Sequence, residues 1–322
     1  MISSHAHVVI TGGAGFVGSH LCQELLDRGA AVTAIDNLST GHEANLAEIR
    51  AHPRFVFRAD DITDKRAFDD LHDVTHLVHL ACPASPKANT AMPLETIRAA
   101  TIGTLNALDL TADTGARAVV ASSSEIYGDP QVHPQVEHYR GNADPVGVFS
   151  AYTEGKRVTE AAAAAHARLG TNVGIVRPFN VYGPKMWPDD GRVVSAFCAA
   201  ALSGQTLILD NGGTQTRSLV WIGDFVDGLI ALLDTDHRGP VNLGSEDEVT
   251  IRDLAELVVR LAGTGSVEIG PGRSDVVTVR RPDITLARTL LGWSPTTSLE
   301  VGVQRCLDWM CEALDGNKNT AA

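Results

Sequence analysis

The sequence predicts an α/β fold in which a doubly wound parallel sheet is joined to a smaller C-terminal α/β domain. About the first 180 residues alternate short apolar runs with longer helical patterns. Continuous apolar strands that alternate with helices are typical of a parallel sheet covered on both faces. After Asn180 the elements become shorter, and residues 183–192 are rich in Pro, Gly and Asp. A chain of 322 residues has room for about two domains of roughly 150 residues each.

The large domain is predicted to begin with a strand at residues 7–11, a glycine turn and a helix over residues 16–28. Further strands are expected at residues 31–36, 55–57, 75–81, 117–122 and 172–179, with a helix at 152–169. Later helices are expected at residues 246–265, capped by Thr250, and at 287–293 and 299–314. We therefore place the large domain at residues 1–178, with a return segment at 219–245. The small domain takes residues 179–218 and 246–316.

The composition excludes several classes of function. There are 26 Lys and Arg against 39 Asp and Glu, which gives a formal charge of −13. A chain this acidic is a poor binder of nucleic acid or anionic membrane. The five cysteines form no C-x-x-C pair, and the histidines show no ligand spacing, so we expect neither disulfides nor a metal. Since no apolar run reaches about 18 residues and the N-terminus lacks signal-peptide features, we expect a cytoplasmic protein.

The segment TGGAGFVG, residues 11–18, follows the first strand and opens a helix. Gly12 permits a tight turn, Gly15 lets the backbone approach a pyrophosphate, and Gly18 lets the helix pack on the sheet. The N-terminus of the helix, with Phe16 and Val17, would add a partial positive charge for the phosphates. A simple turn is the alternative interpretation, but the strand–turn–helix context favours a Rossmann-type dinucleotide site.

Asp36 ends the second strand, where a carboxylate would accept hydrogen bonds from the adenosine ribose hydroxyls. The same carboxylate would repel a 2′-phosphate, and the next residue is Asn37 rather than Arg. The sequence therefore predicts NAD rather than NADP as the cofactor. Asp61 and Ile62, after the third strand, are candidates for the adenine pocket. A turn role for Asp36 and a solvated loop at Asp61 are the alternatives.

Tyr152 and Lys156 are four residues apart, so a helix places both side chains on one face. A tyrosine has a pKa near 10, and a neighbouring ammonium together with the positive nicotinamide would lower it toward about 7. Tyr152 would then accept the proton of a sugar hydroxyl while hydride leaves the same carbon. Such a pair also arises by chance, and it gains weight from its place between the fifth and sixth strands.

The fifth strand ends in a run of serines followed by an acid. Ligands of doubly wound sheets bind at the carboxyl ends of the strands. Ser123 and Ser124 are therefore candidates to bind the reacting hydroxyl, and Glu125 lies within reach of the sugar. A serine-rich turn without catalytic function is the alternative.

Nine segments together resemble the extended short-chain dehydrogenase/reductase family over nearly the whole chain. Within its nucleotide-sugar branch, the chain is most similar to UDP-glucuronate decarboxylases (UDP-xylose synthases) and UDP-glucuronate 4-epimerases. The segments are TGGAGFVGSHL, HLACPASP, TIGTLN, SSSEIYGDP, YTEGKR, RPFNVYGP, DGRVVSAF, TQTR and VRRPDI.

The resemblance implies that Tyr152 is the base, that Lys156 holds the nicotinamide ribose and that Ser123 supplies the catalytic hydroxyl. It also implies that Glu125 is the acidic residue of the decarboxylases and that Arg280 binds the substrate carboxylate. UDP contacts are implied for Asn180, Arg192 and Arg217, further cofactor contacts for Leu80 and Ala81, and further substrate contacts for Ala84, Ser124 and Lys185. The family further implies a UDP-sugar substrate and a homodimer formed through the Tyr152 helix and a helix at residues 94–114.

The chain departs from the decarboxylase motifs near the sugar, for example at Cys82 and at Ser123, where the family has Ser and Thr. These departures favour 4-epimerisation of UDP-glucuronate to UDP-galacturonate through a 4-keto-hexuronate. The alternative is decarboxylation to UDP-xylose, which Glu125 and Arg280 favour. A 4,6-dehydratase is less favoured because Ser124 replaces the required Asp. A non-catalytic NAD sensor is less favoured because Tyr152 and the lysine of the pair are both present.

Overall fold

The computed structural model describes residues 2–272 and 277–320. Its centre is a seven-stranded sheet with the strand order β11-β6-β5-β4-β1-β2-β3, in which every neighbouring pair is parallel. The strands are β1 (His7–Thr11), β2 (Ala31–Ile35), β3 (Phe55–Arg58), β4 (His76–His79), β5 (Arg117–Ala121), β6 (Val173–Pro178) and β11 (Pro240–Leu243). The predicted doubly wound parallel sheet is confirmed.

The strand order reverses between β1 and β4. After β3 the chain crosses over β1 and continues outward on the other side through β4, β5 and β6. Connections on the two sides of such a point diverge and leave a crevice at the carboxyl ends of the strands. The fold therefore fixes the location of a ligand site before any side chain is considered.

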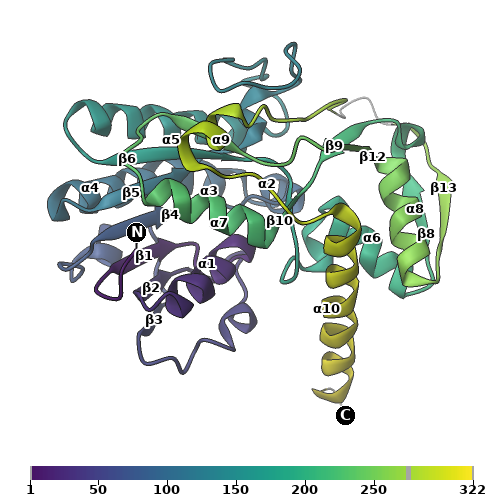
Figure 1. The fold of residues 1–322 in the computed structure, drawn as a ribbon, viewed down its shortest axis with the longest axis horizontal. Helices are drawn as coiled ribbons and strands as arrows, with labels where there is room; N and C mark the ends of the chain where they lie inside the picture. Colours follow the sequence, from purple (N-terminus) through teal and green to yellow (C-terminus); the bar gives the residue numbers. More distant parts are fainter. Residues whose placement is uncertain (1, 273–276, 321–322) are drawn as a thin grey trace.

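Helices cover both faces of the sheet (Figure 1). Buried side chains of α1 (Phe16–Asp27), α7 (Ile222–Leu233) and α9 (Thr285–Leu291) form one core with the strands. Those of α4 (Thr104–Thr114) and α5 (Ser150–Arg168) form a second core. Val8 and Ile10 of β1 belong to the first core and Val9 to the second, because successive side chains of a strand point to opposite faces.

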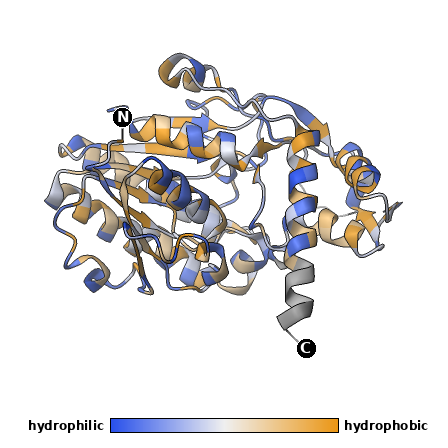
Figure 2. Cartoon of the chain, turned by 60° about the horizontal axis from the view of Figure 1, so that its bottom comes forward, coloured by the Kyte–Doolittle hydropathy of each residue, from blue (hydrophilic) through white to orange (hydrophobic). Residues whose placement is uncertain are grey.

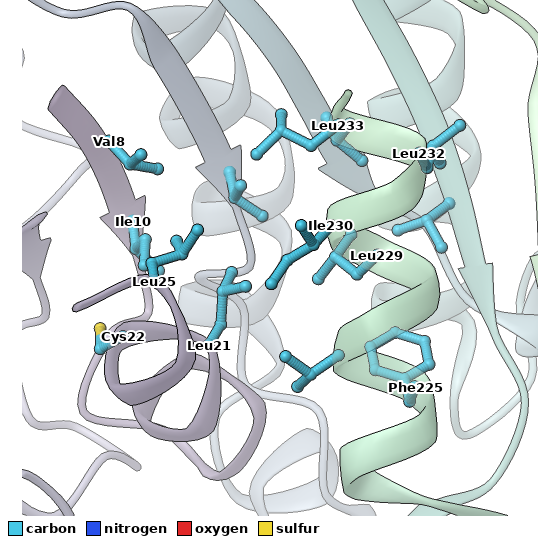
Figure 3. Close-up of a cluster of buried hydrophobic side chains, with 14 of the residues drawn as sticks. Val8, Ile10, Leu21, Cys22, Leu25, Phe225, Leu229, Ile230, Leu232 and Leu233 are labelled. Carbon is cyan, nitrogen blue, oxygen red and sulfur yellow. The ribbon is translucent and has the colours of Figure 1, made fainter. Parts of the chain in front are cut away.

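The first core shows why α7 belongs to the large sheet although it comes late in the chain. Leu21 and Leu25 of α1 pack beside Leu229 and Ile230 of α7 under strand β1 (Figure 3). All four side chains are at most 1% exposed. Full burial of one leucine contributes about 1.5–3 kcal/mol, so this contact ties the returning segment firmly to the N-terminal half.

The helix predicted at residues 94–114 is divided in the structure. It consists of α3 (Pro93–Arg98), a π-helical turn (Ala99–Gly103) and α4, and the short helix α2 (Pro86–Ala91) precedes it. A Cβ on Gly155 of α5 would lie 2.8 Å from the Cβ of Ala100 in this turn. The glycine thus permits the close approach of the catalytic helix to the turn, a tertiary contact that the local pattern does not encode.

The small domain has a core of its own, built on short elements. Helices α6 (Val193–Leu202), α8 (Ile251–Ala262) and α10 (Leu299–Thr320) pack with the strand pair β8 (Thr206–Leu209) and β13 (Ser266–Ile269). Two more strand pairs join β9 (Thr216–Ser218) to β12 (Glu248–Thr250) and β7 (Val181–Tyr182) to β10 (Val220–Trp221). Between β10 and β12 the chain rejoins the large sheet through β11. The exact domain boundaries stay a prediction.

Two further observations concern the helices. Helix α8 begins only at Ile251, because residues 248–250 form β12. Thr250 caps the helix by accepting a hydrogen bond from the Asp253 N–H at 3.0 Å.

Apolar residues gather along the strands and on the helix faces turned toward them (Figure 2). Over residues 2–272 and 277–320, no helix has both the length and the apolar character needed to span a membrane.

Candidate active site

A cleft lies at the carboxyl ends of the strands, where the strand order reverses. It has two adjoining parts, with cavity volumes of about 420 Å³ and about 320 Å³. The larger part contains Tyr152, and the smaller part contains the glycine turn. Residues lining both parts are Phe16, Val17, Leu80, Ala84 and Arg192.

The glycine turn forms the floor of the smaller cavity. Gly12 has a φ of 75°, and a Cβ there would lie 2.8 Å from the Ala81 nitrogen. A Cβ on Gly18 would overlap with the Gly12 carbonyl oxygen. Side chains larger than hydrogen would therefore push the turn away from the neighbouring strand and from a ligand. The first turn of α1 begins at Phe16, directly above this floor.

Asp36 is fixed at the end of β2 by backbone hydrogen bonds. Its Oδ2 accepts from the Ala14 N–H at 3.0 Å, and its Oδ1 accepts from the Leu38 N–H at 2.9 Å. Burial raises the pKa of the Asp36 carboxyl, and the backbone hydrogen bonds oppose this rise. Beside it, Asn37 donates a hydrogen bond to the Asp61 carboxylate at 2.9 Å.

These groups fit a dinucleotide, since close-approaching backbone N–H groups suit a pyrophosphate and an ordered carboxylate suits ribose hydroxyls. The sequence analysis assigned eleven residues outside the Tyr/Lys pair to the cofactor, and all of them line the smaller cavity. They are Gly12, Gly15, Phe16, Val17, Gly18, Asp36, Asn37, Asp61, Ile62, Leu80 and Ala81. Their individual contacts with NAD stay predictions.

The five residues assigned to catalysis line the larger cavity. Tyr152 and Lys156 come from α5, while Ser123, Ser124 and Glu125 follow β5. The Lys156 Nζ lies 5.8 Å from the centre of the Tyr152 ring. It donates a hydrogen bond to the Ala121 carbonyl at 2.7 Å, which joins α5 to the end of β5.

Burial is the main influence on the pKa values of Tyr152 and Lys156. It corrects the expectation that the pKa of Tyr152 is lowered by its protein neighbours. Burial raises the pKa of the Tyr152 phenol, Cys82 and Glu125 raise it further, and a hydrogen bond from Ser123 lowers it. Burial also lowers the pKa of the Lys156 ammonium. The surrounding residues therefore hold the pKa of the tyrosine above its usual value, so a low value requires the positive charge of the nicotinamide as well as Lys156.

Most residues assigned to the substrate lie beside the catalytic group. The larger cavity is lined by Ala84, Ser124, Asn180, Arg192 and Arg217. Two residues are exceptions: Arg280 is buried behind Glu125 and lines neither cavity, and Lys185 lines only the smaller cavity. Its backbone adopts a φ of 65°, and its ammonium donates to the Asn45 carbonyl at 3.0 Å. This left-handed backbone turns the side chain toward the cofactor side, and sequence spacing gives no sign of it.

Two arginines, the buried Arg280 and the half-buried Arg217, lie next to Glu125. Arg280 forms an ion pair with Glu125 and donates to the Gly128 carbonyl at 3.2 Å. Its Nε has no hydrogen-bond partner within the described part of the chain. Burial, with the nearby charge of Arg280, lowers the pKa of Arg217 to about 10. Positive charge is thus concentrated here in a protein that is acidic overall.

The sequence analysis missed several residues of the cleft. Apolar side chains of Tyr182, Met186, Val193, Val194 and Phe225 line the larger cavity. Ser39, Thr40, His42, Asn45 and Trp187 line the smaller one. A tryptophan inside a Pro-, Gly- and Asp-rich loop was the available signal for Trp187; the others depend on long-range packing. Among the residues that the structure describes, no cluster of His, Cys, Asp and Glu could hold a metal.

Known proteins resemble this chain in both sequence and structure. Two UDP-glucuronic acid decarboxylases of Arabidopsis thaliana, numbers 1 and 5, are each 44% identical to it; the matches cover 92% and 93% of this chain and 68% and 88% of those proteins. UDP-glucuronic acid decarboxylase 1 of Danio rerio is 40% identical, over 97% of this chain and 74% of that protein.

Solved structures with the same fold include a UDP-glucose 4-epimerase of Thermotoga maritima with UDP-glucose and a dTDP-glucose 4,6-dehydratase of Streptomyces venezuelae with NAD bound. Both have a TM-score of 0.88 and 28% identity; the matches cover 96% of this chain and 99% and 98% of those chains. Residues 8–244 match the NAD dependent epimerase/dehydratase family. The chain therefore belongs to this family of extended short-chain dehydrogenases/reductases, as an enzyme with NAD as its cofactor.

Proposed function

We propose that the chain catalyses the NAD-dependent decarboxylation of UDP-glucuronate to UDP-xylose. The sequence analysis favoured 4-epimerisation and kept this reaction as the alternative. The relatives at 40–44% identity are named UDP-glucuronic acid decarboxylases, and they favour the alternative. The observation that carries the proposal is the ion pair that the buried Arg280 forms with Glu125, a residue that lines the cavity of Tyr152.

Arg280 is suited to bind a substrate carboxylate. Its guanidinium is buried, pairs with the Glu125 carboxylate and keeps an unused Nε–H in the described structure. A second carboxylate at this place gains charge-assisted hydrogen bonds from a planar donor group. Glu125 thus occupies, in the free protein, a position that the C6 carboxylate of a uronic acid would share or take over.

The first chemical step is the oxidation of the sugar at C4. Tyr152, hydrogen-bonded to Ser123, accepts the proton of the C4 hydroxyl, and bound NAD supplies the hydride acceptor. Lys156 provides a positive charge 5.8 Å from the phenol ring, which favours the ionised tyrosine. The product is a ketone at C4, which is β to the C6 carboxylate.

A β-keto acid loses carbon dioxide because the ketone oxygen accepts the electron pair of the breaking C5–C6 bond. The enolate then takes a proton from water at C5. The hydride given up in the first step would return to C4 from the reduced cofactor, and Tyr152 gives its proton back to the C4 oxygen. Arg280 sets the orientation of the carboxylate, and decarboxylation requires the C5–C6 bond to stand perpendicular to the carbonyl plane. The same residues would serve 4-epimerisation only if this orientation were avoided.

Cationic and amide side chains of the larger cavity suit the nucleotide. Arg192 and Arg217 line this cavity with Asn180, whose Nδ2 donates to the Ser218 carbonyl at 3.2 Å. Guanidinium groups bind diphosphate oxygens in bidentate fashion. We therefore assign UDP to these side chains, with the sugar directed toward Tyr152.

The reaction itself provides the first test. Incubation with UDP-glucuronate and NAD should yield a nucleotide sugar whose mass is lower by that of one carbon dioxide. Liquid chromatography with mass spectrometry would detect this product. An isomer of unchanged mass would show epimerisation instead. Absence of any product, with NAD bound, would revive the sensor interpretation.

The second prediction concerns Arg280→Ala. Loss of a charge-assisted contact of about 1.5–3 kcal/mol should lower kcat/KM for UDP-glucuronate by about 10- to 100-fold. Because Arg280 is assigned to the carboxylate only, the Kd for UDP, measured by calorimetry, should change by less than about threefold. Arg288→Ala, an exposed arginine paired with Glu246, is the matched control. Equal losses for UDP and UDP-glucuronate would contradict the assignment.

The third prediction concerns pH. Tyr152 acts as the ionised phenol, so kcat should rise with pH as the tyrosine of the complex loses its proton; burial, which raises its pKa, moves this rise to higher pH. In Lys156→Met, loss of a charge about 6 Å away should move the rise upward by about one to two pH units. The exposed Lys65→Met serves as control. An unmoved profile would mean that Lys156 acts only in holding the cofactor.

The fourth prediction concerns the expected homodimer. Leu94, Ile97, Ile102, Leu105 and Val158 project from α3, the π turn, α4 and α5, and each is 38–62% exposed. We propose that a second copy covers this apolar face. Leu105→Glu should then convert the dimer to monomer in analytical ultracentrifugation, while Ile269→Glu, on β13, should not. A wild-type monomer at micromolar concentration would refute the proposal.

A further inference from the structure

The loop after β7 crosses to the far side of the cofactor cavity. The Trp187 Nε1 donates a hydrogen bond to Asn45 Oδ1 at 3.1 Å, and its ring lies 5.2 Å from the His42 ring. The Lys185 Nζ donates to the Asn45 carbonyl at 3.0 Å and lies 3.7 Å from a Glu48 carboxylate oxygen. Asn45 belongs to the 3-10 helix η1 (Glu43–Leu46), in the segment that follows β2.

Both sides of this contact are anchored. On one side, Asn45 Nδ2 donates to the carbonyl of Ala14 at 2.9 Å, inside the glycine turn, and the His42 N–H donates to the same carbonyl at 3.1 Å. On the other side, the Trp187 ring meets Trp309 of α10 edge-on at 5.6 Å. The contact therefore links the floor of the cofactor site to the core of the small domain.

We propose that His42, Asn45, Lys185 and Trp187 form a clasp that retains NAD, and that Trp187 is its positioning residue. All four line the smaller cavity, and Lys185 and Trp187 contact Asn45 and His42 from a segment about 140 positions further along the chain. A dinucleotide on the glycine turn then lies between the cleft floor and a closed contact. It leaves only when the loop after β7 separates from η1.

The loop after β7 contains one residue with a strained backbone, which indicates that the loop holds a specific position. Lys185 is a non-glycine residue with a φ of 65°, a conformation that costs roughly 1–2 kcal/mol. The preceding residue, Pro184, is held by a hydrogen bond of 3.0 Å between the His20 Nε2 and the Pro184 carbonyl oxygen. In this conformation the Lys185 ammonium donates to the Asn45 carbonyl.

Retention suits an enzyme whose cofactor is restored in each cycle. The sugar must exchange after every turnover, whereas NAD need not. The inference rests on NAD as the cofactor and holds for decarboxylation and epimerisation alike, so its failure and that of the proposed reaction are separate outcomes.

The test measures the dissociation rate of the reduced cofactor. The enzyme is loaded with NADH and mixed with excess NAD in a stopped-flow instrument, and the decay of NADH fluorescence gives the rate. Trp187→Ala removes one hydrogen bond and two ring contacts, and dissociation should become about tenfold faster or more. Trp187→Phe, which keeps the ring contacts, should fall in between. Trp221→Phe is the matched control, since that ring packs against Tyr182 and Arg305 instead.

A structural defect is distinguished by two further measurements. If Trp187 only retains the cofactor, the Kd for NAD should rise with the dissociation rate, while the Tm of the cofactor-free variant should match that of the cofactor-free wild type. Lys185→Met removes the second contact with Asn45 without opening the aromatic cluster, and it should also speed dissociation if Trp187→Ala fails to fold. Unchanged dissociation in a folded Trp187→Ala or Lys185→Met variant would overturn the clasp.

Discussion

The hydrogen bond from the Lys156 ammonium to the Ala121 carbonyl joins the two elements on which the site depends. It connects α5, which carries Tyr152, to the end of β5, from which Ser123 and Glu125 follow. A buried ammonium needs a partner of this kind, because removal from water otherwise favours its neutral form. One interaction thus keeps a positive charge in the interior and aligns the base with the hydroxyl and acid beside it.

The arginines of the site also carry a cost of burial, which a nearby group of opposite charge partly offsets. Arg280 is buried and Arg217 is half-buried, and the charge of Arg280 helps to lower the pKa of Arg217. Glu125 compensates through its ion pair with Arg280. Such an arrangement is unfavourable without anions, so a diphosphate and a carboxylate would relieve it on binding. The overall charge of −13 makes this local concentration of arginine the principal attraction for an anionic substrate.

The sequence was sufficient for those features that depend on local pattern. Six of the seven strands of the large sheet, the glycine turn, Asp36 and the Tyr152–Lys156 spacing are readable within a window of some twenty residues, whereas β11 was not predicted as a strand. The roles assigned to them remain predictions, although the structure brings them into one cleft. What could not be predicted depends on contacts between distant segments or on backbone angles. Glu125 and Arg280 meet across 155 positions, and Lys185 turns away from the sugar because of its φ.

The choice between epimerisation and decarboxylation also could not be made from local sequence patterns. Cys82 and Ser123 differ from the decarboxylase motifs, and from sequence alone this suggested a changed outcome. In the structure, Ser123 still hydrogen-bonds to Tyr152, so a serine provides the hydroxyl that a threonine would. Burial raises the pKa of the Cys82 thiol, and this residue lines the smaller cavity, on the cofactor side of the cleft. Both Glu125 and Arg280, the groups proposed to orient a carboxylate, are kept, and the Glu125 N–H donates to the Ser123 hydroxyl at 3.1 Å. In the proposed reaction, the orientation of the carboxylate decides whether the 4-keto acid keeps or loses its carbon dioxide.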